Sequence, residues 1–226
     1  MYQREPSTER RKYFRECYSE LLIPSGFKYI KNSFIKIIPH ELLISVWMQQ
    51  YGGMDQPKIT CIPFAIFPDF VLIAGGLRDI DIWHTGWRID HAHMTDLWEN
   101  RKTIQWTKTI FEQHIYPYIK NVTELEQILE YEIKIVDRFM PKLTAFFGIL
   151  YIYIYLQKYE EAAKLLQENE KYMAERFRQG GWPREMMRML TQNPHTDAMQ
   201  QVKENIEFWD QYCQTKYPSY FRGKKK

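Results

Sequence analysis

The chain has 226 residues, with 31 basic and 28 acidic side chains and a formal net charge of only +3. Hydrophobic residues make up 45% and charged residues 26%, which are ordinary globular values and exclude wholesale disorder. A net charge this small does not by itself indicate nucleic-acid binding. The three widely spaced cysteines, Cys17, Cys61 and Cys213, fit neither a disulfide framework nor a zinc ribbon.

The N-terminus, MYQREPSTERRKY, lacks the apolar stretch of a signal peptide. No apolar run approaches the roughly 18 residues of a transmembrane helix, so we expect a soluble, cytoplasmic protein without membrane contact. The glycine pairs at 52–53, 75–76 and 180–181 lack G-x-G-x-x-G or Walker spacing. No nucleotide or other cofactor is therefore expected.

The N-terminal third predicts a helix followed by antiparallel strands. Apolar residues between Tyr13 and Leu22 recur at helical spacing, Ser7 or Thr8 is the expected N-cap, and Pro24 and Gly26 are expected to end the helix. Four β-rich runs follow. They cover residues 27–30, 34–37, 42–48 and 59–67, with a hairpin turn at 31–33 and Pro63 expected to break the last run or place it at an edge.

Beyond residue 95 the hydrophobic period becomes helical. Thr123 and Glu126 form the expected capping box of one helix, and Ala162 is expected where two antiparallel helices meet. The predicted fold class is α+β, an N-terminal helix on a small antiparallel sheet followed by a C-terminal α-helical half. The predicted domains are residues 1–94 and 95–226, or one continuous domain. The predicted helices cover residues 97–118, 124–133, 141–157 and 160–177, a short segment after Pro183, and a last helix ending near Lys216.

Residues 9–120 resemble a family of bacterial domains of unknown function, the family numbered 4304. The resemblance is carried by Gly26-Phe27-Lys28, by residues 32–36 and 46–49, and by the segments 104–118 and 123–125. Members of this family are similar to small cytosolic proteins found near bacterial toxin and immunity genes. The resemblance therefore implies an interaction protein more than an enzyme.

Residues 146–172 resemble one tetratricopeptide repeat, with Leu150 and Asn169 departing from its pattern. Only one copy is visible, and a solenoid needs about three repeats, so a docked helical hairpin is favoured over a peptide-binding groove. The matching residues are Phe146, Ile149, Tyr153, Tyr159, Glu161, Ala162 and Leu166.

Residues 68–94 show no regular period and predict a long ordered loop, with a short strand at 70–74. Long loops in compact proteins are more often functional than not. Trp and Arg, which dominate binding hot spots, gather within it, although a structural plug between sheet and helices is the alternative for the two Trp. The candidate partner-binding residues are Arg78, Asp81, Trp83, His84, Trp87, Arg88, His91 and His93.

The same loop allows a second interpretation. His84, His91 and His93 lie among several Asp, and residues 55–100 carry a local charge of −4, which favours a divalent cation. No H-E-x-x-H or other specific metal spacing is present, and imidazoles in such a loop often only satisfy hydrogen bonds. No residue is assigned as catalytic or as a metal ligand, because no G-x-S-x-G occurs and no Cys lies near a His in sequence.

Our leading hypothesis is a non-catalytic bacterial interaction protein of the immunity or antitoxin kind, which binds another protein, such as a toxin, through residues 78–93. The first alternative is a metal-assisted hydrolase that uses His84, His91 and His93. The second alternative is a nucleic-acid-binding accessory protein, because residues 1–40 carry 8 basic and 4 acidic side chains and the chain ends in Arg-Gly-Lys-Lys-Lys.

Overall fold

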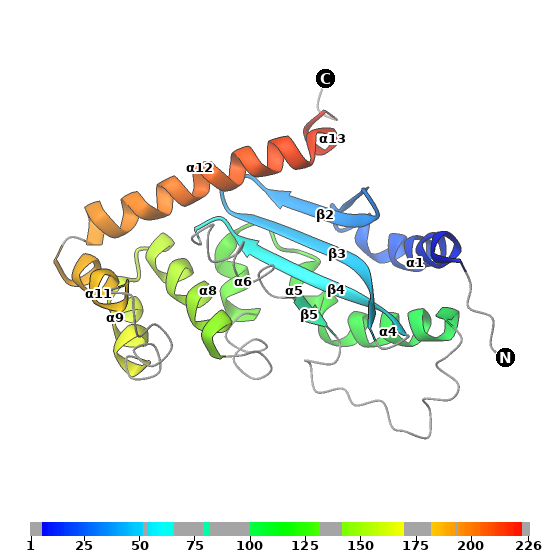
Figure 1. The fold of residues 1–226 in the computed structure, drawn as a ribbon, viewed down its shortest axis with the longest axis horizontal. Helices are drawn as coiled ribbons and strands as arrows, with labels where there is room; N and C mark the ends of the chain where they lie inside the picture. The colour runs from blue at the N-terminus through cyan, green and yellow to red at the C-terminus, as the bar shows by residue number, and fades with distance from the viewer. Residues whose placement is uncertain are drawn as a thin grey trace.

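The computed structural model describes residues 6–51, 54–65, 79–81, 100–131, 142–169, 182–192 and 194–222. An N-terminal helix is followed by an antiparallel sheet and then by a helical C-terminal half, which is the predicted α+β class (Figure 1). All described secondary structure after residue 100 is helical. The change from period 2 to period 3.6 in the sequence therefore predicted the order of sheet and helices correctly, while the boundary at 94 and 95 lies outside the described residues.

The sheet has five strands in the order β1-β2-β3-β4-β5, and every neighbouring pair is antiparallel. Strands β1 and β2, and strands β2 and β3, are joined by short turns, which place consecutive strands side by side. The strands are β1 (Lys28–Ile30), β2 (Ser33–Ile38), β3 (Leu42–Tyr51), β4 (Met54–Pro63) and β5 (Asp79–Asp81).

The β1–β2 hairpin turn consists of two residues, Lys31 and Asn32, both with positive φ (49° and 65°). Ile30 pairs directly with Ser33 across it. Two consecutive residues with positive φ match the twist of a tight hairpin, and Asn tolerates this conformation best after Gly. The hairpin predicted at 31–33 is confirmed, with Ser33 belonging to the strand.

Strand β4 begins five residues before the predicted run, and Pro63 is its last residue. Its pairing with β5 is confined to residues 58–60, between Pro57 and Pro63, neither of which has an N–H to donate. Of the two alternatives for Pro63, the break of the run is confirmed, because β4 ends at Pro63 and residues 64–65 form a turn, whereas an edge position is wrong for residues 58–60. Strand β5 escaped prediction because three residues are too few to establish alternation, and the strand expected at 70–74 lies outside the described residues.

The described helices vary widely in length, and α12 is the longest of them, with 18 residues. A π-helical turn, η3, directly precedes it. None of the helices among the described residues is both long and apolar enough to cross a membrane. The helices are α1 (Ser7–Leu22), α4 (Asn100–His114), α5 (Tyr116–Ile119), α6 (Leu125–Tyr131), α8 (Lys142–Tyr155), α9 (Tyr159–Glu168), α11 (Trp182–Gln192), η3 (Pro194–Ala198), α12 (Met199–Lys216) and α13 (Pro218–Phe221).

Both faces of the sheet are buried, because alternate strand residues enter two different hydrophobic clusters. Phe34, Ile44 and Ile59 join α1, α4, α5 and α6 on one face. Ile35 and Leu43 join α9, α11 and α12 on the other face. Helix α8, whose sequence is almost continuously apolar, contributes to both clusters. Residues from both sides of the predicted boundary at 94 and 95 thus share each cluster.

Two helix starts differ from their predictions. Helix α1 begins at Ser7, and Pro6 occupies the N-cap without any side-chain cap, so the capping role expected of Ser7 or Thr8 is wrong. At α6 the side chain that reaches back to the Thr123 N–H is that of Gln127, at 2.8 Å. The predicted partner, Glu126, instead accepts a hydrogen bond from Lys158.

The α8–α9 hairpin gives one prediction about stability. Ala162 is fully buried in α9, which packs against α8. We expect Ala162→Trp to lower the free energy of unfolding by about 1–3 kcal/mol, because a large ring must displace packed neighbours. Urea denaturation measures this change. A variant as stable as the parent would mean that Ala162 faces solvent, and Lys164→Trp, at an exposed position of the same helix, is the control.

Tyr18 gives a second prediction. Its side chain is completely buried, and its hydroxyl has no hydrogen-bond partner among the described residues. Burial raises the pKa of Tyr18, and the nearby Thr107 hydroxyl donates to the Ile104 carbonyl. Because Tyr18→Phe removes an unsatisfied buried hydroxyl, we expect unchanged or increased stability. Tyr116→Phe is the matched control and should cost about 1 kcal/mol, because that hydroxyl bonds Ser25 and the Leu21 carbonyl. Equal losses in both variants would contradict this assignment.

Candidate partner-binding surface

The residues predicted to bind a partner lie almost entirely outside the described part of the chain. Of the eight, only Asp81 falls in a described segment, where it pairs with Lys58 at the end of β5. The hypotheses that residues 78–93 bind a partner, or that His84, His91 and His93 bind a metal, therefore stay predictions. Among the residues that the structure describes, no group of three His, Cys, Asp or Glu side chains is placed to hold a metal ion.

The described residues contain a different candidate, the outer face of α12. Phe208 is 39% exposed, although its neighbour Trp209 is 1% exposed in the core. The Phe208 and Tyr212 rings, one helical turn apart, lie nearly parallel with centroids 6.5 Å apart. They line a shallow depression of about 480 Å³ together with Gln211, Thr215 and Lys216. We call these five residues the α12 surface.

The ammonium group of Lys216 lies at one end of the α12 surface. The Lys216 Nζ lies 4.8 Å from the Tyr212 ring centroid, within the range of a cation–π contact, and also donates a hydrogen bond to the Tyr212 hydroxyl. Burial alone would lower the pKa of Lys216, but the hydroxyls of Tyr212 and Tyr217 raise it overall. Lys216 therefore stays charged at neutral pH, and its contacts with Tyr212 hold that ring in place.

The β1–β2 hairpin brings two more lysines to the same end of α12. Lys28 donates to the Tyr220 carbonyl at 2.6 Å, and Lys31 donates to the Lys216 carbonyl at 3.0 Å. Carbonyls at the end of a helix lack partners within the helix and carry partial negative charge, so lysines stabilise them. We call Lys28, Lys31, Lys216 and the exposed Arg222 the basic rim of the α12 surface. It unites basic residues from both ends of the sequence.

His40, in the connection between β2 and β3, and Asp210 of α12 form a third contact between the sheet and α12. Asp210 accepts hydrogen bonds from the backbone N–H of His40 at 3.2 Å and from its Nδ1 at 2.5 Å. His40 has φ of +65°, so the bonds fix a turn that would otherwise be costly for this residue. A His–Asp pair is also the orienting part of a catalytic triad, but both described hydrogen bonds of His40 go to Asp210 and neither goes to a nucleophile.

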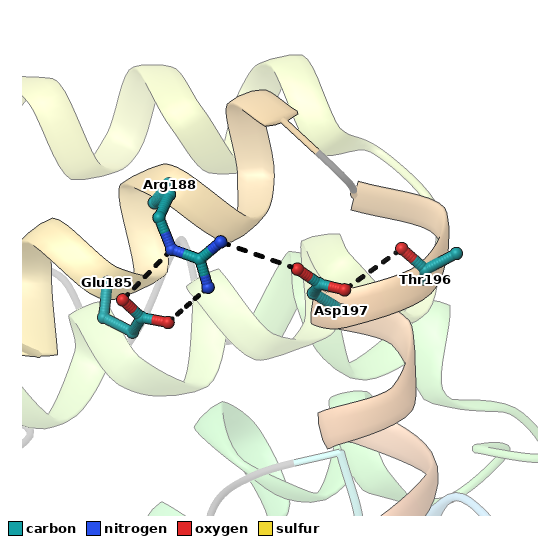
Figure 2. A network of polar contacts seen from close by, with 4 residues as sticks. All are labelled: Glu185, Arg188, Thr196 and Asp197. Atoms are coloured by element: carbon teal, nitrogen blue, oxygen red, sulfur yellow. Dashed lines mark hydrogen bonds and ion pairs between the residues drawn. The ribbon is translucent and has the colours of Figure 1, made fainter.

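A polar network occupies the other end of α12 (Figure 2). Arg188 of α11 donates to both carboxylate oxygens of Glu185, at 2.5 and 3.2 Å, and lies 3.9 Å from Asp197 of η3. Asp197 also accepts from the Thr196 hydroxyl at 3.1 Å. Arg188 lowers the pKa of Glu185, and Glu185 in turn raises the pKa of Arg188. The network therefore links α11 to the start of α12.

Beside this network is an open depression of about 570 Å³. Its lining mixes both signs of charge, with Arg188 and Lys203 near Asp197 and Glu204. The electrostatic field in this depression therefore favours neither an anion nor a cation. The α12 surface differs, because basic side chains gather at the C-terminal end of its apolar rings, and apolar rings beside a charged rim are the arrangement of a protein-binding site.

The α12 surface was not predicted from the sequence. The last helix was predicted, but its aromatic residues were assigned to no surface. One signal was available, because Phe208, Trp209, Tyr212 and Cys213 cover more of the helix circumference than one buried stripe requires. The approach of Lys28 and Lys31 to the helix end had no signal, since sequence separations of 192 and 185 residues leave no local pattern.

The fold and this surface together define an α+β protein with an aromatic, lysine-flanked helix face. No protein-family model, no curated protein and no solved structure matches the chain. The resemblances to the bacterial family of unknown function and to a tetratricopeptide repeat accordingly stay predictions.

Proposed function

We propose that this chain is a non-catalytic interaction protein of the immunity or antitoxin kind, which acts by binding another protein directly. The observation that supports the proposal is the α12 surface. Large aromatic rings held in place on a rigid helix lose little entropy when a partner covers them, and such residues dominate binding hot spots. Only three large hydrophobic side chains are exposed among the described residues, and Phe208 is one of them.

The predicted contact residues between Arg78 and His93 form a second, separate part of this proposal. Of this range the structure describes only β5 (Asp79–Asp81), which is at the opposite edge of the sheet from β1. The basic rim includes Lys28 of β1 and Lys31 of the turn that follows, and both bond the C-terminal helices. The α12 surface therefore adjoins the edge of the sheet that β1 forms. Variants in the two regions therefore test two different docking modes of the same protein.

Photocrosslinking tests the α12 surface. Gln211 lies within the depression, so benzoylphenylalanine at position 211 should capture one protein species from the native cell. The same residue at position 164, an exposed site on α9, is the matched control and should not capture that species. The captured protein is then purified, and its affinity for the parent chain and its variants is measured directly.

With the purified partner, we expect Phe208→Ala to weaken binding by about 30-fold, equivalent to about 2 kcal/mol, while the melting temperature stays nearly unchanged. Truncation of an exposed ring removes contact area with the partner but little of the core. If Phe208→Ala binds normally while Trp83→Ala or Trp87→Ala does not, the contact is centred on residues 78–93 instead. If the partner is a toxin, co-expression of the parent chain should restore growth and Phe208→Ala should not.

A further inference from the structure

The charge at the C-terminal end of the α12 surface is one-sided. Residues 27–38 of the hairpin contain Lys28 and Lys31, which bond carbonyls of α13 and α12, and Lys36, which donates instead to the Lys120 carbonyl at the end of α5. Neither this segment nor residues 211–222, which contain Lys216 and Arg222, has an Asp or Glu. The two segments are in contact, because the Tyr220 hydroxyl bonds the backbone N–H and carbonyl of Ile37. Asp210 is bound by His40, and the exposed Glu204 and Glu207 lie at the opposite, N-terminal end of the surface, beside Phe208.

We infer that the partner presents an acidic surface, with carboxylates around an apolar or aromatic side chain that enters the α12 depression. This inference rests on the proposed function and names the chemistry of the partner. Lys28, Lys31, Lys216 and Arg222 are all exposed, so their charges reach the solvent side of the helix. Acidic groups opposite them accelerate association and fix orientation, while Phe208 and Tyr212 supply buried area.

The geometry favours an acidic protein over a nucleic acid. Proteins that bind single strands stack bases on open aromatic faces. Here Lys216 lies over the Tyr212 ring at 4.8 Å, and Lys28 lies over the Tyr220 ring at 4.7 Å. Each of these ring faces is thus already covered by an ammonium group.

The test uses four labelled probes: a random copolymer of glutamate and tyrosine, polyglutamate, polylysine and oligothymidylate. Fluorescence anisotropy measures their binding to the full chain. We expect the acidic aromatic copolymer to bind most tightly, polyglutamate more weakly, and polylysine not at all. The double variant Lys216→Gln/Arg222→Gln should lose at least about tenfold in affinity for the copolymer and show a smaller salt dependence.

The matched control is Lys164→Gln/Lys203→Gln, which removes two exposed lysines from α9 and from the opposite end of α12 and should bind normally. Thermal melts of both double variants show whether they remain folded. Tighter binding of oligothymidylate would overturn the inference in favour of a nucleic acid, and absence of copolymer binding would also overturn it.

The same variants separate the inference from the function on which it rests. With the crosslinked partner, loss of affinity in Phe208→Ala but not in Lys216→Gln/Arg222→Gln would keep the α12 surface and overturn the acidic partner. Normal affinity in both variants would remove the α12 surface from the proposed function altogether.

Discussion

Trp209→Ala is expected to be the most destabilising truncation on α12, with a loss of about 3–5 kcal/mol in the free energy of unfolding. The Trp209 side chain is 1% exposed and lies between α12 and the sheet, where its ring stacks on Phe64 at 6.5 Å between centroids. Phe64 directly follows β4, and the neighbouring core residues cannot fill a cavity the size of an indole. Urea unfolding at neutral pH measures the loss.

The adjacent residue provides the control. Phe208→Ala removes a ring of similar size from the same turn of the same helix, but this ring is 39% exposed. We expect a stability change well below that of Trp209→Ala, and the contrast separates the residue that anchors α12 from the residue available to a partner. Equal losses in the two variants would mean that Phe208 belongs to the core and that the α12 surface is not a docking site.

The fold was predictable because its elements rely on local patterns. The Lys31-Asn32 turn needs positive φ, which Asn accepts, and the alternation in β2 and β3 places successive residues in two different clusters. The start of α6 was predicted less well. Its first N–H groups are satisfied by Gln127 and by Glu41, and Glu41 comes from the β2–β3 connection 84 residues away. No capping rule based on neighbouring residues finds such a partner.

The candidate site was less predictable than the fold. The predicted contact surface was centred on residues 78–93, because this stretch of the sequence is rich in Trp and His and has no regular period to explain them. On α12 the same helical pattern accounts for Trp209, which is buried, and Phe208, which is not. Burial depends on which side of α12 meets the rest of the protein, and contacts between residues distant in sequence, such as Trp209 with Phe64, establish that side.

A buried amide fixes the position of α12 on the end of β4. Asn205 is 2% exposed, and its Nδ2 donates to the Ala65 carbonyl at 2.7 Å. Its Oδ1 accepts from Gln201 Nε2 at 3.2 Å. The side chain at position 205 therefore has to supply both a donor and an acceptor, as an amide does. An ionised carboxylate of the same shape supplies only acceptors.

Asn205→Asp should accordingly destabilise the protein by about 3 kcal/mol or more at pH 7, because a buried charge would face a carbonyl oxygen. Burial raises the pKa of such an aspartate above its unfolded value of about 3.9, so the folded state binds the proton more tightly than the unfolded state. Stability relative to the parent should thus recover as pH falls toward the unfolded pKa, since the protonated acid can donate to Ala65. Urea unfolding at several pH values between neutral and mildly acidic measures this trend.

Gln214→Glu, which introduces the same charge at an exposed position of α12, is the control. Its stability should stay within about 0.5 kcal/mol of the parent throughout this pH range. An Asn205→Asp variant with parental stability at pH 7 would show that Asn205 does not bond Ala65, and α12 would then have to meet β4 differently.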